Sequence, residues 1–88
     1  MLKTAKVYFD DDKHRTYDYF FDDRIIKVTN KHLVLVEGGD RFTVGRVDEI
    51  LYTVSDSCTK PVLASIHLSK AFQNRVDQER ILIEEMLK

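Results

Sequence analysis

The chain has 88 residues, of which 43% are hydrophobic and 33% charged, and its net charge at pH 7 is −1. Typical domains contain about 50–200 residues, so this length predicts one domain, and the composition is that of a globular protein and not of a disordered one. The near-zero charge excludes the broad basic surface of a dedicated duplex-DNA-binding protein.

The sequence also argues against a membrane or secreted protein. Its longest apolar runs, such as Leu33–Val36, are far shorter than the ~20 residues that cross a bilayer. The first nine residues lack the apolar segment and the cleavage site of a signal peptide, so we expect none. The single cysteine, Cys58, cannot form an internal disulfide. We therefore expect a cytoplasmic protein with no membrane partner.

Two strands are predicted at the start of the chain. In residues 4–9 and again in residues 15–21, every second side chain is apolar or aromatic, which is the period of a half-buried strand. The side chains on these faces are Ala5, Val7 and Phe9 in the first run, and Tyr17, Tyr19 and Phe21 in the second. The polar sequence DDDKH lies between the runs, so a hairpin with a loop of four to five residues is predicted.

A second hairpin is predicted in the middle of the chain. His32–Glu37 and Arg41–Val54 have strand character, and Gly38-Gly39 supplies a turn between them because glycine accepts positive φ. Gly45 interrupts the alternation of the longer run. A glycine at such a position predicts a bulge or a sharp bend, as a small barrel needs at a corner.

The last quarter of the chain changes from strand to helix. After the only proline, Pro61, the apolar residues Val62, Ala64, Ile66 and Leu68 alternate and predict a final strand. From Ser69, the expected N-cap, the spacing becomes helical. The apolar side chains at this spacing, called the helix stripe below, are Phe72, Val76, Leu82, Ile83, Met86 and Leu87.

These elements predict an α+β fold that is mainly β with one α-helix. We expect a small, strongly bent antiparallel sheet or SH3-like barrel of five to six strands in residues 1–68, and a C-terminal helix in residues 69–88, in a single domain. The helix is predicted to dock on its own barrel. The residues expected to make that contact are Phe72, Val76, Ile83 and Leu87.

Acidic residues are concentrated early in the chain. The six carboxylates are Asp10, Asp11, Asp12, Asp18, Asp22 and Asp23. If residues 15–21 are extended, the first three lie about 20–25 Å from the last two. That distance is too long for one metal site or one catalytic pair. We therefore interpret the two groups as the ends of strands and predict no metal.

No catalytic or cofactor site is predicted. Cys58 has no base near it in the sequence, and His14, His32 and His67 are scattered without the spacing of metal ligands. The glycines match neither phosphate-binding fingerprint, because no helix start follows them. The chain is therefore not expected to be an enzyme.

One family resemblance is found in Ala5–Ile50. The segments Val7–Phe9, Tyr17–Tyr19, Leu33–Val36 and Val44–Val47 follow one another in an order that resembles the N-terminal DNA-binding domain of the primosomal helicase PriA. The family's strands contain the patterns V-G-x-x-V-x-V and V-G-x-V. This chain departs from them, with Val-Thr-Asn at residues 28–30 where the pattern has Val-Gly. The resemblance implies an SH3-like barrel and recognition of a DNA 3′ end. Only the fold is carried over, because the early segment is acidic.

Two functions are compatible with the sequence. The favoured one is a non-enzymatic interaction module or inhibitor, of the kind that accessory genes of bacteria or their phages encode, which binds and modulates a partner protein. Surplus aromatic residues and an acidic surface that imitates phosphates support it. The contact residues expected for it are Asp10, Asp11, Asp12, Asp18, Asp22, Asp23, Tyr17 and Tyr19.

The alternative is a single-stranded nucleic-acid-binding barrel, in which aromatic rings stack on bases and cations contact phosphates. The stacking rings would be Tyr17, Tyr19 and Phe42, and the phosphate contacts Arg24, Lys27, Arg41 and Arg46. The sequence also suggests a homodimer. It would use Ile81, which lies away from the helix stripe, together with exposed strand aromatics.

Overall fold

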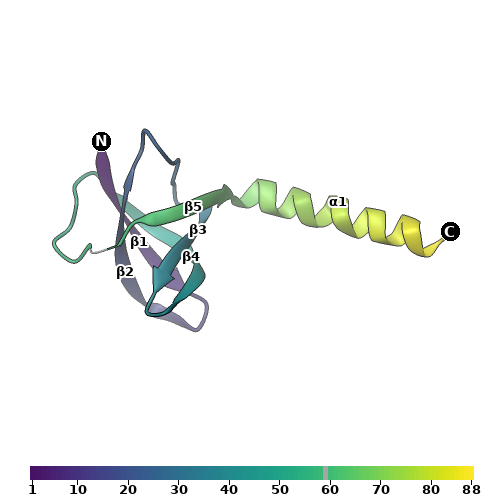
Figure 1. Ribbon diagram of the computed structural model, residues 1–88, viewed down its shortest axis with the longest axis horizontal. Helices are drawn as coiled ribbons and strands as arrows, with labels where there is room; N and C mark the ends of the chain where they lie inside the picture. The colour runs from purple at the N-terminus through teal and green to yellow at the C-terminus, as the bar shows by residue number, and fades with distance from the viewer. Residues whose placement is uncertain (59) are drawn as a thin grey trace.

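The described residues form one five-stranded antiparallel sheet and one C-terminal helix, so the predicted mainly-β, α+β class is confirmed (Figure 1). The computed structural model describes residues 1–58 and 60–88. The elements are β1 (Leu2–Phe9), β2 (Asp12–Asp22), β3 (His32–Gly38), β4 (Arg41–Leu51), β5 (Val62–His67) and α1 (Leu68–Met86). The strand order across the sheet is β2-β1-β4-β3-β5.

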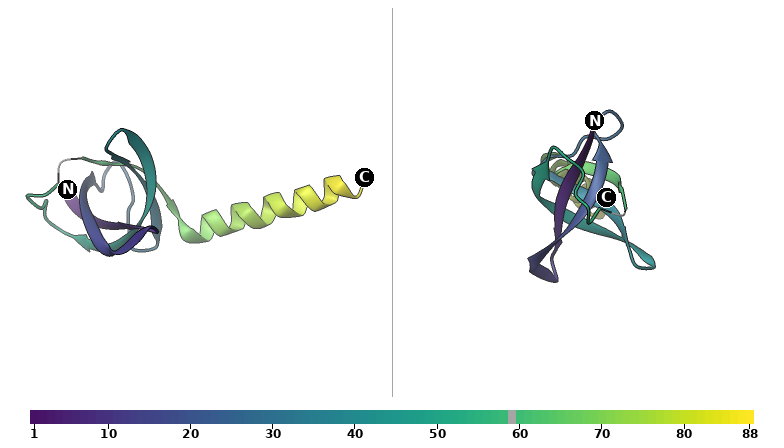
Figure 2. Two further views of the ribbon diagram at one scale, coloured as in Figure 1. Left: turned by 90° about the horizontal axis from the view of Figure 1, so that it is seen from below. Right: turned by 90° about the vertical axis from the view of Figure 1, so that its left-hand side faces the viewer.

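The sheet is strongly bent, as Figure 2 shows, so its two edges approach each other. The backbone N–H of Phe20, in edge strand β2, donates a hydrogen bond of 3.2 Å to the carbonyl of Lys60. Phe20 also forms a parallel bridge with Pro61, just before the other edge strand, β5. These contacts reduce the unpaired backbone at the edges, which would otherwise invite association with other strands.

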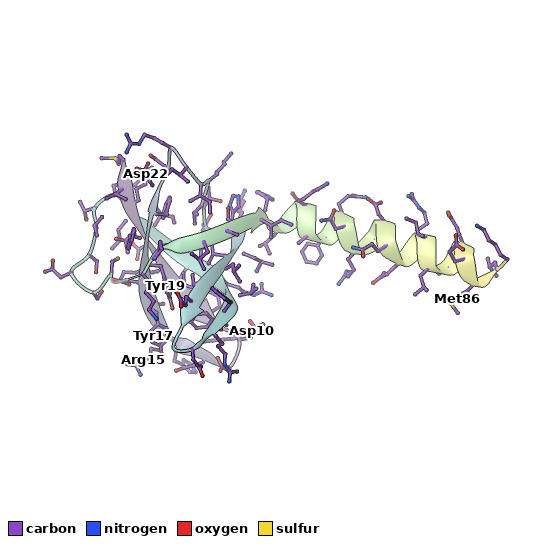
Figure 3. The ribbon with its side chains drawn as sticks, in the orientation of Figure 1. Asp10, Arg15, Tyr17, Tyr19, Asp22 and Met86 are labelled. Atoms are coloured by element: carbon purple, nitrogen blue, oxygen red, sulfur yellow. The ribbon has the colours of Figure 1, made fainter. Side chains whose placement is uncertain are left out.

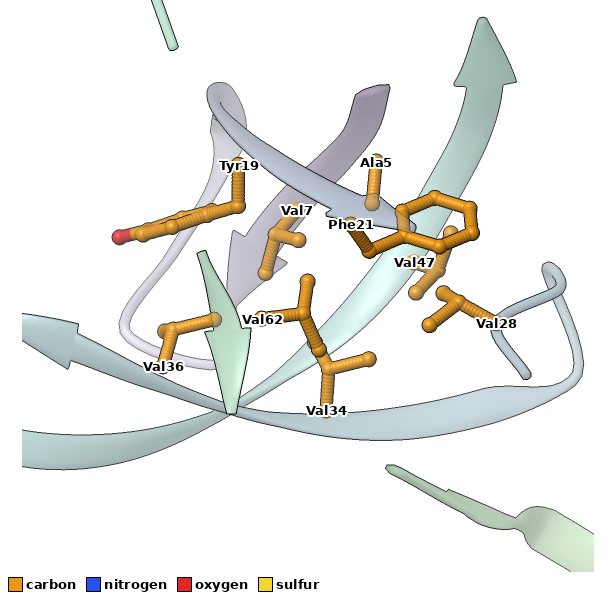
Figure 4. Packing of buried hydrophobic residues seen from close by; sticks show 9 residues of the cluster. All are labelled: Ala5, Val7, Tyr19, Phe21, Val28, Val34, Val36, Val47 and Val62. Atoms are coloured by element: carbon orange, nitrogen blue, oxygen red, sulfur yellow. The ribbon is translucent and has the colours of Figure 1, made fainter. Parts of the chain in front are cut away.

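The core lies on the concave side of the bent sheet (Figure 4). Its side chains are Ala5, Val7, Tyr19, Phe21, Val28, Val34, Val36, Val47 and Val62. Valine dominates because its β-branched side chain suits the extended backbone and packs well on a pleated surface. The predicted inward faces of β1 and β2 are confirmed for Ala5, Val7, Tyr19 and Phe21. Tyr17, at the end of its predicted face, is 39% exposed.

Of the two features predicted at Gly45, a bulge or a sharp bend, the bulge lies elsewhere in β4. Gly45 pairs in regular register with Val34 of β3. The irregularity in β4 is at Asp48, because Lys6 of β1 pairs with Glu49 while the next residue, Val7, pairs with Val47. Gly45 instead allows close packing, since a Cβ there would lie 2.9 Å from Cε1 of Phe9 and closer still to Val7.

Two other sequence expectations need correction. In the first hairpin the turn comprises only residues 10 and 11, and Asp12 already pairs with Phe9, so the predicted loop of four to five residues is wrong in its bounds. In β5, a bulge at Leu63 breaks the predicted alternation, because Ala64 pairs with Leu35 but Val62 pairs with Val36. Val62 therefore faces the core, while Ala64 is exposed on the other side of the sheet.

The prediction that the helix docks on the barrel is wrong. α1 extends away from the sheet (Figure 1), gives the molecule a length of 56 Å, and has no buried residue. Phe72, Val76 and Ile83 are each more than half exposed. The reason is the junction with β5, which has no loop in which the chain could turn back. No helix in the described residues is long and apolar enough to cross a membrane.

The start of α1 also differs from its predicted form. His67, and not Ser69, is the N-cap residue, with an extended backbone at φ −64° and ψ 138°. Its Nδ1 accepts hydrogen bonds from the backbone N–H of Ser69 at 3.1 Å and from the Ser69 hydroxyl at 2.7 Å. The backbone N–H of Leu68 donates to the Lys31 carbonyl at 2.8 Å, which ties the helix start to the residue before β3.

The contact at Gly45 gives a first prediction. Gly45→Ala should lower the free energy of unfolding by about 1–3 kcal/mol, because the added methyl overlaps Val7 and Phe9 in a packed site. Urea denaturation measures the change. The matched control is Gly38→Ala, where a Cβ meets nothing within 4 Å, and its effect should stay within about 0.5 kcal/mol. Equal effects of the two substitutions would contradict the packing role of Gly45.

Candidate functional site

The side of the sheet opposite the core has a patch of apolar side chains. Leu33 of β3 pairs with Ile66 of β5, and Leu35 pairs with Val44 of β4 and with Ala64 of β5. These five residues, called the outer apolar face below, line a shallow groove of about 220 Å³. The groove is open to solvent, with Val44 58% exposed.

The outer apolar face arises because β3 is apolar on both sides. An antiparallel sheet with one face in water normally alternates apolar and polar residues, as β1 does with Lys6 and Val7. In β3 the run Leu33–Val36 places Val34 and Val36 in the core and puts leucines on the opposite side. Contiguous exposed apolar surface of this kind is a candidate interaction site.

Aromatic and charged side chains border the outer apolar face. Phe42, at the start of β4, is 67% exposed and pairs with Glu37 of β3. Arg46 pairs with Leu33 in the sheet, and its Nε lies 3.5 Å from Oδ1 of Asp10. An apolar centre with a polar rim is the usual composition of a protein-binding surface.

The structure separates the predicted acidic contact residues into three places. Asp10 and Asp22 lie at opposite ends of the sheet (Figure 3), as the length of β2 predicted. Asp22 is bound by Arg24, with 2.6 Å between Nη2 and Oδ2, and the amino group of Met1 lies 2.7 Å from Oδ1 of Asp23. The hydrogen bonds from Arg24 hold the pKa of Asp22 far below its usual range. These two carboxylates already have partners within the chain.

Asp18 is the centre of a hydrogen-bond network near the middle of β2. Its Oδ2 accepts hydrogen bonds from the hydroxyls of Ser55 at 2.7 Å and Ser57 at 2.8 Å, while Lys6 Nζ donates to Oδ1 at 3.1 Å. Burial raises the pKa of Asp18, but these three hydrogen bonds outweigh it and hold the pKa below its usual value. The network attaches the loop after β4 to the sheet, so Asp18 has a structural role.

Asp11 and Asp12 lie beside a second, more polar groove. Asp11 in the β1–β2 turn and Asp12 at the start of β2 line this open groove of about 690 Å³ with Tyr17 and with the β3–β4 turn. The Tyr17 ring lies 5.8 Å from Phe9 and 5.2 Å below the Arg15 guanidinium. The structure therefore brings Tyr17 together with Asp11 and Asp12, and not with Asp22 or Asp23.

The residues proposed for nucleic-acid binding do not form one surface. Tyr19 is 7% exposed in the core, so a base cannot stack on it without the core opening (Figure 4). Arg24 is held by Asp22, and Arg46 faces Asp10. Phe42 and Arg41 lie exposed at the start of β4, while Lys27 lies in the segment between β2 and β3.

Two histidines that are distant in the sequence meet at the junction with the helix. The His32 and His67 rings are 5.1 Å apart in an edge-to-face arrangement. His32 is buried, and its Nδ1 makes a 2.8 Å hydrogen bond with the Thr29 hydroxyl. Burial, followed by the charges of His67 and Lys27, lowers the pKa of His32. The pair serves packing, and in the described residues no group of three potential ligands is placed to hold a metal.

The thiol of Cys58 contacts no histidine in the described part of the chain. Its Sγ lies 3.4 Å from Oγ1 of the buried Thr4, whose hydroxyl also donates to the Thr53 carbonyl at 2.6 Å. The thiol therefore belongs to the set of contacts that holds the loop after β4 against β1.

Comparisons of the chain with protein-family models, with characterised proteins and with solved structures gave no match.

The Asp18 network gives a second prediction. Asp18→Asn should lower the free energy of unfolding at neutral pH by about 1–3 kcal/mol, because a charged acceptor of three hydrogen bonds is lost. The pKa of Asp18 in the folded protein lies below the usual 3.8, so the stabilisation of the fold by its carboxylate is present above that pH. It is lost as the pH falls from there through the folded pKa.

Urea denaturation of the two proteins across this pH range measures the effect. The difference between wild type and Asp18→Asn should shrink in acid, whereas the exposed-turn control Asp11→Asn should match wild type throughout. A difference that stays constant with pH would show that the carboxylate charge of Asp18 is not what stabilises the loop.

Proposed function

We propose that this chain is a non-enzymatic interaction module that binds a partner protein through the outer apolar face. The observation that supports the proposal is the groove between β3, β4 and β5, which is lined by apolar side chains and open to solvent. Phe42 at its border supplies an aromatic side chain of the type enriched in protein interfaces.

The bent sheet supports a finer assignment of the fold. We propose an SH3-like arrangement, in which the hydrogen bond between Phe20 and Lys60 and the bridge between Phe20 and Pro61 bring the two sheet edges together. A rigid small domain of this kind presents a binding face with little loss of conformational entropy on association.

The partner that fits this surface presents an apolar segment, with polar groups around it for the rim. Binding would remove the exposed parts of Leu33, Leu35 and Val44 from water, at about 25 cal/mol for each Å² of apolar surface. By occupying a partner's surface the module would act as an inhibitor or modulator, as an accessory protein of a bacterium or phage does. Asp11, Asp12 and Tyr17 are proposed as a second, charged contact beside the polar groove.

The third prediction tests the outer apolar face. Val44→Asp should weaken partner binding at least about tenfold, because a carboxylate would be moved from water into an apolar contact. It should leave the fold intact, since Val44 is 58% exposed. Affinity capture from a lysate of the native host, quantified by mass spectrometry, identifies proteins that wild type retains and Val44→Asp loses. Their affinities are then measured with purified components.

The matched control is Ile25→Asp, which introduces the same charge at an apolar residue that is 85% exposed and outside the groove. It should retain the partner. The proposal is contradicted if every captured protein binds Val44→Asp as well as wild type. Titration of labelled single-stranded DNA at low salt tests the alternative function, because a single-stranded nucleic-acid-binding barrel would bind with a steep salt dependence.

A further inference from the structure

The helix stripe of α1 is the largest uncovered apolar feature outside the sheet. Its six side chains are between 51% and 83% exposed, and none of the helix is buried against the sheet. Figure 3 shows Met86 at the far end of the helix, remote from every strand. A stripe of this regularity that is not buried against the sheet indicates a surface for another molecule.

The helix has few sources of stability of its own. Most helical stability in proteins comes from packing of the apolar face and not from the intrinsic helix propensity of the residues. α1 has no acidic residue in its first turn and no basic residue in its last, so its termini gain nothing from the helix dipole. Its internal ion pairs are long and exposed, such as Arg75–Glu79 at 3.7 Å, and contribute little.

We propose that α1 pairs with α1 of a second copy of this chain, in an antiparallel arrangement, through the helix stripe. The distribution of charge within the stripe selects both the partner and the direction. In heptad notation Phe72, Val76, Ile83 and Met86 occupy a and d positions, and Glu79 interrupts them at a d position. In a parallel, in-register pair Glu79 would face Glu79 of the other copy, which is repulsive.

An antiparallel pair removes that repulsion. When the helices are centred between residues 77 and 78, Phe72 of each copy lies opposite Ile83 of the other, as a and d positions do in antiparallel coils. Glu79 then lies opposite Val76 of the other copy, within one residue's rise of Arg75. Each Glu79 would then lie near Arg75 of the other copy as well as beside its own Arg75. Glu79 therefore favours the antiparallel direction over the parallel one.

The available area is sufficient for a specific dimer. Burying the six stripe side chains on both copies, at about 50–100 Å² each, removes on the order of 1,000 Å² from water. This is near the lower limit for a specific protein interface. A membrane surface fits less well as the occupant. The segment of residues 68–88 has four cations and four acids, and an anionic bilayer prefers a basic polar face without an acid in the apolar stripe.

Antiparallel pairing would also define where the two sheets lie. α1 is about 28 Å long at 1.5 Å per residue, so the two sheets would sit at opposite ends of the helix pair. Met86 of each copy would lie opposite Ser69 of the other, next to the end of β5. The dimer would present two outer apolar faces and would therefore bind a bivalent partner with avidity. That avidity rests on the proposed function, whereas the pairing of the two helices does not.

The test uses the full chain and two substitutions of the same residue type. Sedimentation velocity over a range of concentrations should show that wild type dimerises and that Ile83→Asp, in the helix stripe, is monomeric with at least about tenfold weaker association. Ile81→Asp is the matched control, because Ile81 is 50% exposed on the opposite side of the helix. It should dimerise like wild type. Val44→Asp should also remain dimeric, which separates this test from that of the proposed function.

Direction is tested by cysteine cross-linking in a Cys58→Ser background. A mixture of Ser69→Cys and Met86→Cys chains should form the mixed disulfide under mild oxidation, whereas Met86→Cys alone should not cross-link to itself. Self-cross-linking of Met86→Cys would show a parallel pair. A wild-type monomer at all concentrations, dimerisation of Ile83→Asp, or loss of the dimer in Ile81→Asp would each overturn the proposal. A monomer that binds anionic lipid vesicles would identify a membrane as the occupant instead.

Discussion

The structure depends on the direct connection between β5 and α1. His67 ends the strand and caps the helix, its ring packs against His32, and the N–H of Leu68 bonds to the Lys31 carbonyl. These contacts fix the direction in which the helix leaves the sheet, without a loop that would let it turn back. An amphipathic helix that would ordinarily cover a sheet is therefore directed into solvent, and the apolar residues of both elements stay uncovered.

The two uncovered surfaces follow from this single constraint, but they differ in chemistry. The outer apolar face is a shallow groove of aliphatic side chains on a rigid sheet, suited to an apolar segment of a different molecule. The helix stripe is long and is interrupted by Glu79, whose ion pair with Arg75 we propose to meet the same pair of a second copy in the antiparallel direction. The acidic residues that dominate the early sequence are mostly neutralised within the chain, as Asp18 and Asp22 show.

Much of this architecture could be predicted from the sequence, because local periodicity determines strands and helices. The alternation around Val7 and Tyr19 identified the first two strands and their buried faces, and the spacing after Ser69 identified the helix. Periodicity does not report how elements pack together, so the position of α1 was predicted wrongly. The bulges at Asp48 and Leu63 depend on pairing with distant strands, which the sequence does not show. One feature of the sequence pointed to the outer apolar face, the uninterrupted apolar run Leu33–Val36. Alternation alone could not show that the side chains of this run lie on both faces of the sheet.

The central claim is that the helix draws its stability from another molecule and not from its own sheet. Hydrogen exchange of the wild-type chain, followed by mass spectrometry at increasing protein concentration, tests it most directly, because protection reports local opening in each element. The account predicts that protection of amides in residues 72–86 rises with concentration, while that of Val7 and Val34 in the core stays constant. Protection of α1 that is independent of concentration and as high as that of the core strands would contradict it.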